Sequence, residues 1–132
     1  MLAAMNLVSK RIIIADDSRS ILRLLTLGME RAGYEVVTAC DGLDALQKIH
    51  DQLPSFLITD IEMPQMTGEE LCLAIEQSFP DRTFPIVVMT TSTNESHRHW
   101  ASKISNTTFI EKPISVKRLV AHIDRCTTEN QP

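Results

Sequence analysis

The chain has 132 residues, the size of one ordinary domain, which leaves no room for a second catalytic domain. Hydrophobic residues make up 43% of it and charged residues 23%, a balance that supports a buried core and excludes a disordered chain. Lys and Arg number 13 against 17 Asp and Glu, giving a formal net charge of −4, and no basic run exceeds two residues. Binding to nucleic acid or to an anionic membrane needs clustered cations, so the composition argues against both.

The start of the chain and its cysteines indicate a cytoplasmic protein. Met1 to Ser9 lacks the basic start and long apolar stretch of a targeting segment, and no apolar run reaches the roughly 18 residues of a membrane span. The three cysteines, Cys40, Cys72 and Cys126, are odd in number and widely spaced, without a Cys-x-x-Cys pair. We therefore expect small buried thiols in a reducing compartment, rather than disulfides or a zinc site.

Short apolar runs alternate with longer stretches of helical period along the chain. Five runs are rich in β-branched or aromatic residues and are continuous rather than alternating, which is typical of strands covered on both faces. They are Ile12–Ala15, Val36–Ala39, Phe56–Thr59, Ile86–Met89 and Thr107–Ile110. We predict that these five runs are β-strands.

Between the runs, apolar residues recur at spacings of three and four, which predicts amphipathic helices. These stripes are Ile21, Leu25, Met29 and Ala32; Leu46, Ile49 and Leu53; Leu71, Ile75 and Phe79; and Val116, Leu119, Val120 and Ile123. Ser115 is expected to cap the last helix. Another helix, at about Asn94 to Lys103, has few apolar residues, and such weak attachment to a core suits an element that moves in a switch.

The predicted order is strand then helix, repeated five times. Strict alternation implies an α/β fold, with a doubly wound five-stranded parallel sheet, right-handed crossovers and helices on both faces. Sheets of this kind bind ligands beyond the carboxyl ends of their strands, where the winding reverses direction. Residues that carry chemistry are therefore expected at that edge.

Polar residues follow four of the five predicted strands. They are Asp16 and Asp17 after the first strand, Asp60 after the third, Thr90 and Thr91 after the fourth, and Lys112 after the fifth. Any single Asp in such a place is more often an ordinary helix cap. The coincidence across four strands is what predicts a functional site.

The expected rim of the sheet is acidic, because three carboxylates meet there with a single ammonium, that of Lys112. A hard divalent cation can offset their repulsion, and Mg²⁺ prefers a few carboxylate or carbonyl oxygens while keeping several waters. An open magnesium position beside a carboxylate suits a phosphoryl group, and aspartate is a known phosphoryl acceptor. We therefore predict a magnesium site that supports phosphoryl transfer to aspartate.

The pair Asp16-Asp17, the segment from Asp60 to Gly68, the single Thr90 and the pair Lys112-Pro113 form a specific combination. In these residues the chain resembles the receiver domain of two-component response regulators, of the chemotaxis type. The resemblance covers about residues 10–126, with residues 1–9 as an N-terminal extension and residues 127–132 as a C-terminal tail. It implies the flavodoxin-like strand order 2-1-3-4-5.

This resemblance implies a role for each acidic residue of the rim. Asp60 would be the phosphoacceptor. Asp17 would bind Mg²⁺ directly, and Asp16 would help through a water molecule. Glu62 would supply its backbone carbonyl to the metal, so that Asp16, Asp17, Asp60 and Glu62 together form the implied metal site.

The resemblance also implies how the phosphoryl group is held and sensed. Lys112 would pair with the phosphoryl oxygens, and Thr90 would move inward to hydrogen-bond one of them. Phe109 occupies the position of the family's switch aromatic, whose rotamer follows the threonine. The peptide bond between Lys112 and Pro113 is implied to be cis.

The chain departs from the family pattern at several positions. Ser105-Asn106 replaces a common Gly-Ala pair, and because Asn tolerates the left-handed turn conformation the fold should survive. Thr91 stands where a small residue is common, which adds a hydroxyl and a methyl group beside the phosphoryl pocket. Glu62 and Ser92 occupy positions that tune the lifetime of the phosphoryl group, and the direction of their effect stays open.

Two features of the segment before the fifth strand have alternative interpretations. Trp100 has the aromatic character of an interface anchor, but its spacing to Ile104 favours a place in the core. His97 and His99 lie two residues apart, so they point in different directions on a helix and cannot chelate one metal together.

We therefore expect a stand-alone, phosphorylation-controlled binding module rather than an enzyme. It would accept a phosphoryl group from a histidine kinase or phosphotransfer protein and then switch its binding to a downstream effector protein. The alternative is a small phosphatase-like enzyme with Asp60 as nucleophile and Glu62 completing an Asp-x-Asp-like arrangement. Such enzymes commonly place that motif after the first strand and carry an additional cap. A flavodoxin is disfavoured because Asp16-Asp17 would repel a flavin phosphate.

Overall fold

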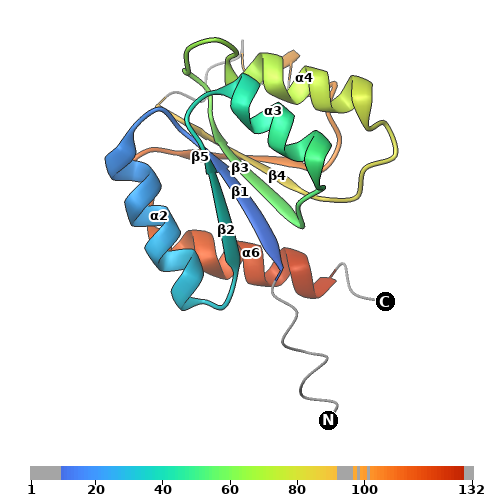
Figure 1. The fold of residues 1–132 in the computed structure, drawn as a ribbon. Helices are drawn as coiled ribbons and strands as arrows, with labels where there is room; N and C mark the ends of the chain where they lie inside the picture. Colours follow the sequence, from blue (N-terminus) through green and yellow to red (C-terminus); the bar gives the residue numbers. More distant parts are fainter. Residues whose placement is uncertain (1–9, 92–96, 98, 101, 130–132) are drawn as a thin grey trace.

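The computed structural model describes residues 10–91, 97, 99–100 and 102–129. A single parallel sheet of five strands, in the order β2-β1-β3-β4-β5, forms its centre (Figure 1). The strands are β1 (Arg11–Ala15), β2 (Glu35–Ala39), β3 (Phe56–Asp60), β4 (Ile86–Thr90) and β5 (Thr107–Glu111). The predicted fold class and strand order are thus confirmed, and each observed strand is one residue longer than the run that predicted it.

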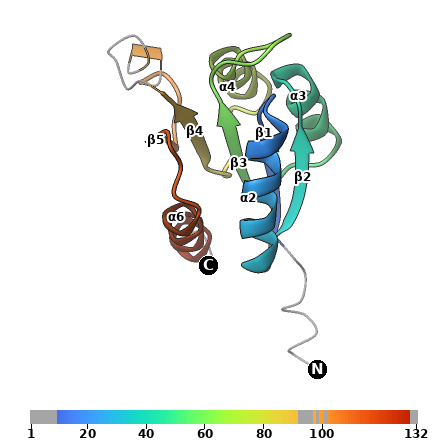
Figure 2. The same cartoon turned by 90° about the vertical axis from the view of Figure 1, so that its left-hand side faces the viewer.

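Helices cover both faces of the sheet. They are α2 (Arg19–Arg31), α3 (Gly42–Asp51), α4 (Gly68–Ser78) and α6 (Val116–Glu129). The pair α2 and α6 lies on one face, and the pair α3 and α4 on the other (Figure 1, Figure 2). The helix expected at about residues 94–103 falls largely outside the described residues, although His97, His99 and Trp100 are helical. No described helix has the length and apolar character needed to cross a membrane.

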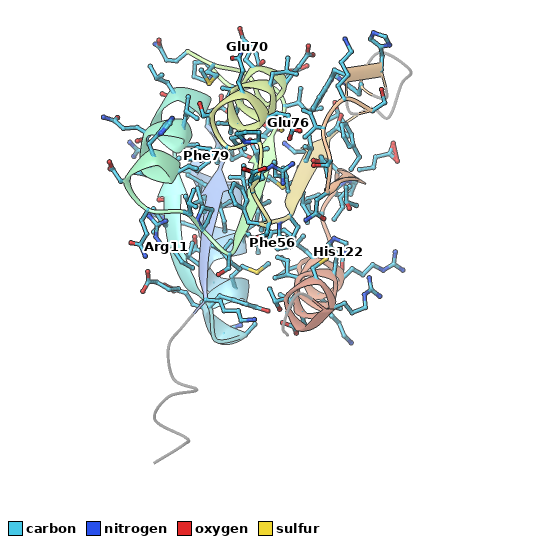
Figure 3. The ribbon with its side chains drawn as sticks, turned by 90° about the vertical axis from the view of Figure 1, so that its right-hand side faces the viewer. Arg11, Phe56, Glu70, Glu76, Phe79 and His122 are labelled. Atoms are coloured by element: carbon cyan, nitrogen blue, oxygen red, sulfur yellow. The ribbon has the colours of Figure 1, made fainter. Side chains whose placement is uncertain are left out.

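Two apolar layers hold the helices against the sheet. Every residue of β3 and β4 is buried, because these inner strands are covered on both faces. Leu25 and Met29 of α2 and Ile123 of α6 fill one layer, and their helices were predicted from this spacing. The rings of Phe56, on β3, and His122, on α6, meet edge to face with their centroids 6.2 Å apart (Figure 3).

The second layer, beneath α3 and α4, includes Trp100. Its side chain is 5% exposed and belongs to the same buried cluster as Ile75 and Ile104. Of the two interpretations open at Trp100, the structure thus favours the core.

Two of the apolar residues that predicted the helices, Ala32 and Leu53, are exposed. They lie beyond the ends of α2 and α3, respectively.

Side-chain caps explain where the helices begin. The Ser18 hydroxyl accepts a hydrogen bond from the Ile21 amide at the start of α2, and Thr67 forms a reciprocal capping box with Glu70 at the start of α4. Ser115 accepts from the Arg118 amide at 3.3 Å, as its position before α6 predicted. These caps satisfy amides that would otherwise lack partners in the first turn.

The three cysteines are free thiols, and only one matches the expected burial. Cys72 is buried on α4, Cys126 is half-buried on α6, and Cys40 is exposed. The expectation of a buried thiol was therefore wrong for Cys40. This residue follows the last residue of β2, an edge strand, so its side chain lies outside both apolar layers.

Arg82 joins the connection after α4 to the segment before β5. Its guanidinium, at 1% exposure, lies 3.5 Å from the Glu76 carboxylate and donates to the backbone carbonyls of Phe84, at 2.5 Å, and Ser105. Burial lowers the pKa of Arg82, while the nearby Glu76 raises it. The neighbouring Asn106 adopts the left-handed conformation, with φ of 52°, which asparagine tolerates.

Candidate functional site

Acidic side chains from two adjacent strands meet at the carboxyl edge of the sheet. Asp16 and Asp17 directly follow β1, and Asp60 is the last residue of β3, which pairs with β1. One carboxylate oxygen from each of the three lies within 4.8 Å of the others. The strand order therefore brings Asp60 next to Asp16 and Asp17, which lie more than 40 positions earlier in the sequence.

Asp16 is the most deeply buried member of this cluster, at 1% exposure. Its Oδ1 accepts a hydrogen bond from the Ser18 amide at 2.9 Å. Its Oδ2 is buried without a hydrogen-bond partner among the described residues. Burial raises the pKa of Asp16, the Ser18 hydrogen bond lowers it, and the negative charge of Asp60 raises it further.

Lys112 provides a positive charge beside the cluster. Its Nζ lies 3.1 Å from Asp60 Oδ1 and 3.8 Å from Asp16 Oδ2. The Lys112 backbone amide donates to the Thr90 carbonyl at 2.7 Å, which ties the residue after β5 to the end of β4. The Lys112–Pro113 peptide bond is cis. The ammonium therefore reaches across β4 to the last residue of β3.

The backbone around Asp60 is tightly packed against the loop that follows β3. Its Oδ1 accepts from the Ile61 amide at 2.9 Å, in addition to the Lys112 contact. Gly68, the first residue of α4, packs so close to this strand that an added Cβ would lie 2.2 Å from the Asp60 carbonyl oxygen. The loop between β3 and α4 thus holds Asp60 in place, and only glycine fits at its far end.

The donor set suits a hard divalent cation. The cluster offers carboxylate oxygens only, and a single ammonium shares its charge between two of the three acids. Asp16 Oδ2 is a buried anionic oxygen without a hydrogen bond, which is the kind of atom that a cation or its bound water would satisfy. Asp17 is exposed, so the cluster opens to solvent on one side. These residues therefore fit Mg²⁺, whose coordination retains several waters.

A cavity of about 750 Å³ opens above the cluster. Its floor includes Asp60 and Thr90, which are 8% and 3% exposed, and its outer wall includes the exposed Glu62 and Thr91. The complete lining consists of Asp17, Asp60, Ile61, Glu62, Met63, Pro64, Thr67, Thr90, Thr91, His97 and Lys112. Ser92, another position singled out from the sequence, lies outside the described residues.

An aromatic group lies beside this cavity. The Phe109 ring, on β5, is half-buried and lies 5.3 Å from the Trp100 ring and 6.4 Å from the His97 ring, measured between centroids. The Trp100 Nε1 donates a hydrogen bond to His97 Nδ1 at 3.3 Å. Sequence reasoning considered His97 only as a metal ligand and missed its place in the cavity wall. Its spacing of three to Trp100 is the one signal that could have suggested their contact.

The site and the fold together can be compared with known proteins. Residues 12–124 match the family model of the response regulator receiver domain. The chain belongs to this family. The receiver fold is also evident among solved structures. A chemotaxis protein CheY4 of Vibrio cholerae has a TM-score of 0.82 and 30% identity, covering 90% of this chain and 99% of that one.

Two further relatives show the range of proteins that carry this receiver. A CheY-like response regulator receiver domain protein from Methanospirillum hungatei JF-1 has a TM-score of 0.84 and 26% identity, covering 92% of this chain and 95% of that one. The alkaline phosphatase synthesis transcriptional regulatory protein PhoP of Bacillus subtilis (strain 168) is 31% identical over 116 residues, which are 88% of this chain and 48% of PhoP. The chain thus spans about half the length of that curated relative.

Proposed function

We propose that Asp60 of this receiver accepts a phosphoryl group from a histidine kinase or phosphotransfer protein in a Mg²⁺-dependent reaction. The observation that carries the proposal is the contact of 3.1 Å between Lys112 Nζ and Asp60 Oδ1, at the floor of an open cavity and beside two further carboxylates. A buried carboxylate in such surroundings is positioned both to attack phosphorus and to have its new charge offset.

The proposed metal site uses Asp17 and Asp60 as direct ligands, Asp16 through a water molecule and the Glu62 backbone carbonyl. Asp17 is exposed and Asp16 is buried, which agrees with an ion held at the outer side of the cluster. Bound there, Mg²⁺ would supply positive charge that offsets the repulsion between the acids and the phosphoryl oxygens.

Three residues of the chain have separate roles in the proposed phosphoryl transfer. An Asp60 carboxylate oxygen forms the new bond to phosphorus, while the bond between phosphorus and the donor breaks and its electron pair leaves with the donor. Lys112, already in contact with Asp60, pairs with the phosphoryl oxygens. Thr90, at the end of β4 and in the cavity floor, hydrogen-bonds one of those oxygens.

The proposed output is a change in binding to an effector protein. Thr90 and Phe109 are the proposed switch residues, because they lie on the neighbouring strands β4 and β5 and Phe109 packs against Trp100. In this proposal residues 10–126 form the receiver, which works in the cytoplasm as a stand-alone signalling module. It catalyses at most its own phosphorylation and dephosphorylation.

Phosphorylation can be tested by intact mass. The protein is incubated with Mg²⁺ and acetyl phosphate, and the wild type is expected to gain one labile phosphoryl group that EDTA prevents. Asp60→Asn should gain none. Asp41→Asn is the matched control, because Asp41 caps α3 through its side chain and asparagine also caps well.

Three results would contradict the proposal. They are a wild type that gains no mass, an Asp60→Asn variant that is phosphorylated equally well, and efficient turnover of simple phosphate esters. The last result would favour the phosphatase-like alternative.

A further inference from the structure

Thr59 places a buried hydroxyl directly beside the proposed phosphoacceptor. It precedes Asp60 on β3 and is 0% exposed, in a strand whose first three residues, Phe56, Leu57 and Ile58, are apolar. The Thr59 Oγ1 donates a hydrogen bond to the Asp60 backbone carbonyl at 2.9 Å. A buried hydroxyl lowers stability unless it is hydrogen-bonded, so this bond holds the Thr59 side chain in one orientation.

The Asp60 carbonyl belongs to a peptide unit that also contacts the Asp60 side chain. The same unit contains the Ile61 amide, which donates to Asp60 Oδ1 at 2.9 Å. A peptide unit is planar, so fixing the direction of its carbonyl also fixes the direction of its amide. Through this unit, the Thr59 hydroxyl therefore orients a donor that binds the Asp60 carboxylate.

The start of α4 also restrains this peptide unit. The Gly68 amide donates to the Ile61 carbonyl at 2.7 Å. A Cβ added at Gly68 would lie 2.2 Å from the Asp60 carbonyl oxygen and 2.8 Å from the Ile61 Cα, so α4 is in close contact with the unit. Hydrogen-bonded to Thr59 and packed against α4, the unit has little freedom to turn.

The orientation of the Asp60 carboxylate depends on this restrained amide. Its Oδ1 is contacted by two donors, the Ile61 amide at 2.9 Å and the Lys112 Nζ at 3.1 Å, which together limit rotation of the carboxylate plane. Hydrogen bonds in a chain polarise one another, so the bond from Thr59 to the carbonyl also strengthens the Ile61 amide as a donor. Alignment of an attacking atom matters, because a misplacement of about 1 Å can lower a rate about 100-fold.

We propose that Thr59 is a positioning residue for phosphoryl transfer to Asp60, and this inference rests on the phosphoacceptor function proposed above. Its hydroxyl holds the peptide unit between Asp60 and Ile61, so that the Ile61 amide keeps the Asp60 carboxylate aligned for attack on phosphorus. Thr59 is absent from the described residues that line the cavity, so it acts through its neighbours and exchanges no proton.

Two substitutions separate the hydroxyl of Thr59 from its methyl group. Thr59→Val keeps a β-branched side chain of nearly the same shape but removes the hydroxyl, whereas Thr59→Ser keeps the hydroxyl and removes the methyl group. The rate of phosphorylation is measured by intact mass with acetyl phosphate and saturating Mg²⁺, well below the Tm of every variant. Thr26→Val is the matched control, because the Thr26 hydroxyl, on α2, is buried without a hydrogen-bond partner among the described residues.

The expected result is that Thr59→Val lowers the rate of phosphorylation about tenfold, the lower end for losing a hydrogen bond that orients a ligand residue. Thr59→Ser should react at close to the wild-type rate, although the lost methyl group lowers its Tm. Thr26→Val should also react like wild type. The rate would then follow the hydroxyl at position 59 rather than the stability of the protein.

The Ile61 amide provides a readout that needs neither metal nor phosphodonor. Its proton chemical shift, measured by NMR in EDTA, reports the strength of its hydrogen bond to Asp60 Oδ1. Thr59→Val should move this resonance upfield and Thr59→Ser should not, and the same spectra show whether each variant is folded. Thr59→Cys, with a thiol as a weaker donor, should fall between the two and replaces Thr59→Val if that variant does not fold.

The two levels of the proposal fail in different ways. If wild type is phosphorylated and Thr59→Val reacts equally fast, or Thr59→Ser is slowed as much as Thr59→Val, the positioning role is overturned while the phosphoacceptor function stands. An unchanged Ile61 amide resonance in Thr59→Val, or an equal loss of rate in Thr26→Val, also overturns the positioning role alone. If wild type gains no phosphoryl group, both are overturned.

Discussion

Replacing Asp16 by asparagine is expected to make the metal-free protein more stable. Asp16 is 1% exposed, its Oδ2 lacks a hydrogen bond among the described residues, and the Asp60 carboxylate adds repulsion. Asparagine has nearly the same shape and can keep the hydrogen bond from the Ser18 amide to Oδ1. The substitution therefore removes a poorly compensated charge while preserving the packing.

The size of the effect follows from the balance of these contacts. A buried polar group without a partner costs about 1–3 kcal/mol, and more when it is charged. Against this, the variant loses the attraction of Lys112, whose Nζ is 3.8 Å from Oδ2 but 3.1 Å from Asp60. A net gain of about 1–2 kcal/mol in the free energy of unfolding is expected, which corresponds to a rise of about 3–8 °C in Tm for a domain of this size.

The difference in the free energy of unfolding between wild type and Asp16→Asn depends on pH, and the sign of this dependence can be derived. The folded protein raises the pKa of Asp16 above its ordinary value, so the folded state binds the proton more tightly than the unfolded state does. The resulting stabilisation is present below the unfolded pKa and is lost as the pH rises through the folded pKa. The advantage of Asp16→Asn should therefore be full at pH 7 and should shrink as the pH falls through that window.

Thermal unfolding with EDTA and with Mg²⁺ provides the assay. Wild type should gain about 1.4 kcal/mol at a Mg²⁺ concentration ten times its Kd, and Asp16→Asn should gain less. Asp17→Asn is a useful comparison, because Asp17 is exposed and its removal should lower the Mg²⁺ response without a comparable gain in EDTA. A lower Tm for Asp16→Asn in EDTA, or an equal response of both proteins to Mg²⁺, would refute the reasoning.

Three other changes test the fold around the site. Arg82→Ala removes the donors to the Phe84 and Ser105 carbonyls, and should lower the free energy of unfolding by about 2–4 kcal/mol, as measured by urea denaturation. A loss under about 1 kcal/mol would contradict the role of Arg82 in connecting the segment after α4 to the segment before β5. Gly68→Ala places a Cβ 2.2 Å from the Asp60 carbonyl oxygen, so Tm and the rate of Asp60 phosphorylation should both fall, and an unchanged Tm would show that the loop adapts freely. Burial raises the pKa of Cys72 to about 12, so iodoacetamide at pH 8 should modify the exposed Cys40 well before Cys72. Peptide mass mapping would measure both rates of modification, and equal rates in the folded protein would argue against the burial of Cys72.

The sheet could be predicted from the sequence because its signal is local. Continuous β-branched runs such as Ile12–Ala15 located every strand to within one residue. The differences at the strand ends also have a physical reason. Asp60 pairs with Met89 and Thr90 with Glu111, so these polar residues are the last positions of β3 and β4 rather than the first positions beyond them.

The gathering of the site residues could be anticipated because parallel strands deliver their carboxyl ends to one edge. The contacts that depend on long-range packing could not. The His97 ring lies against Trp100 and Phe109, and the Arg82 guanidinium donates to the carbonyl of Ser105, 23 residues further along the chain. The burial of Cys40 was predicted wrongly because exposure beside an edge strand depends on sheet order, which the local sequence does not contain.

The packing of Trp100 against Phe109 has a practical consequence. Trp100 is the one tryptophan in the chain, so the intrinsic fluorescence of the protein comes mainly from this buried indole. Its ring contacts the ring of Phe109, and its Nε1 donates a hydrogen bond to His97 Nδ1. A rearrangement of either neighbour would alter the emission of the unlabelled protein, which thereby contains its own optical reporter of that rearrangement.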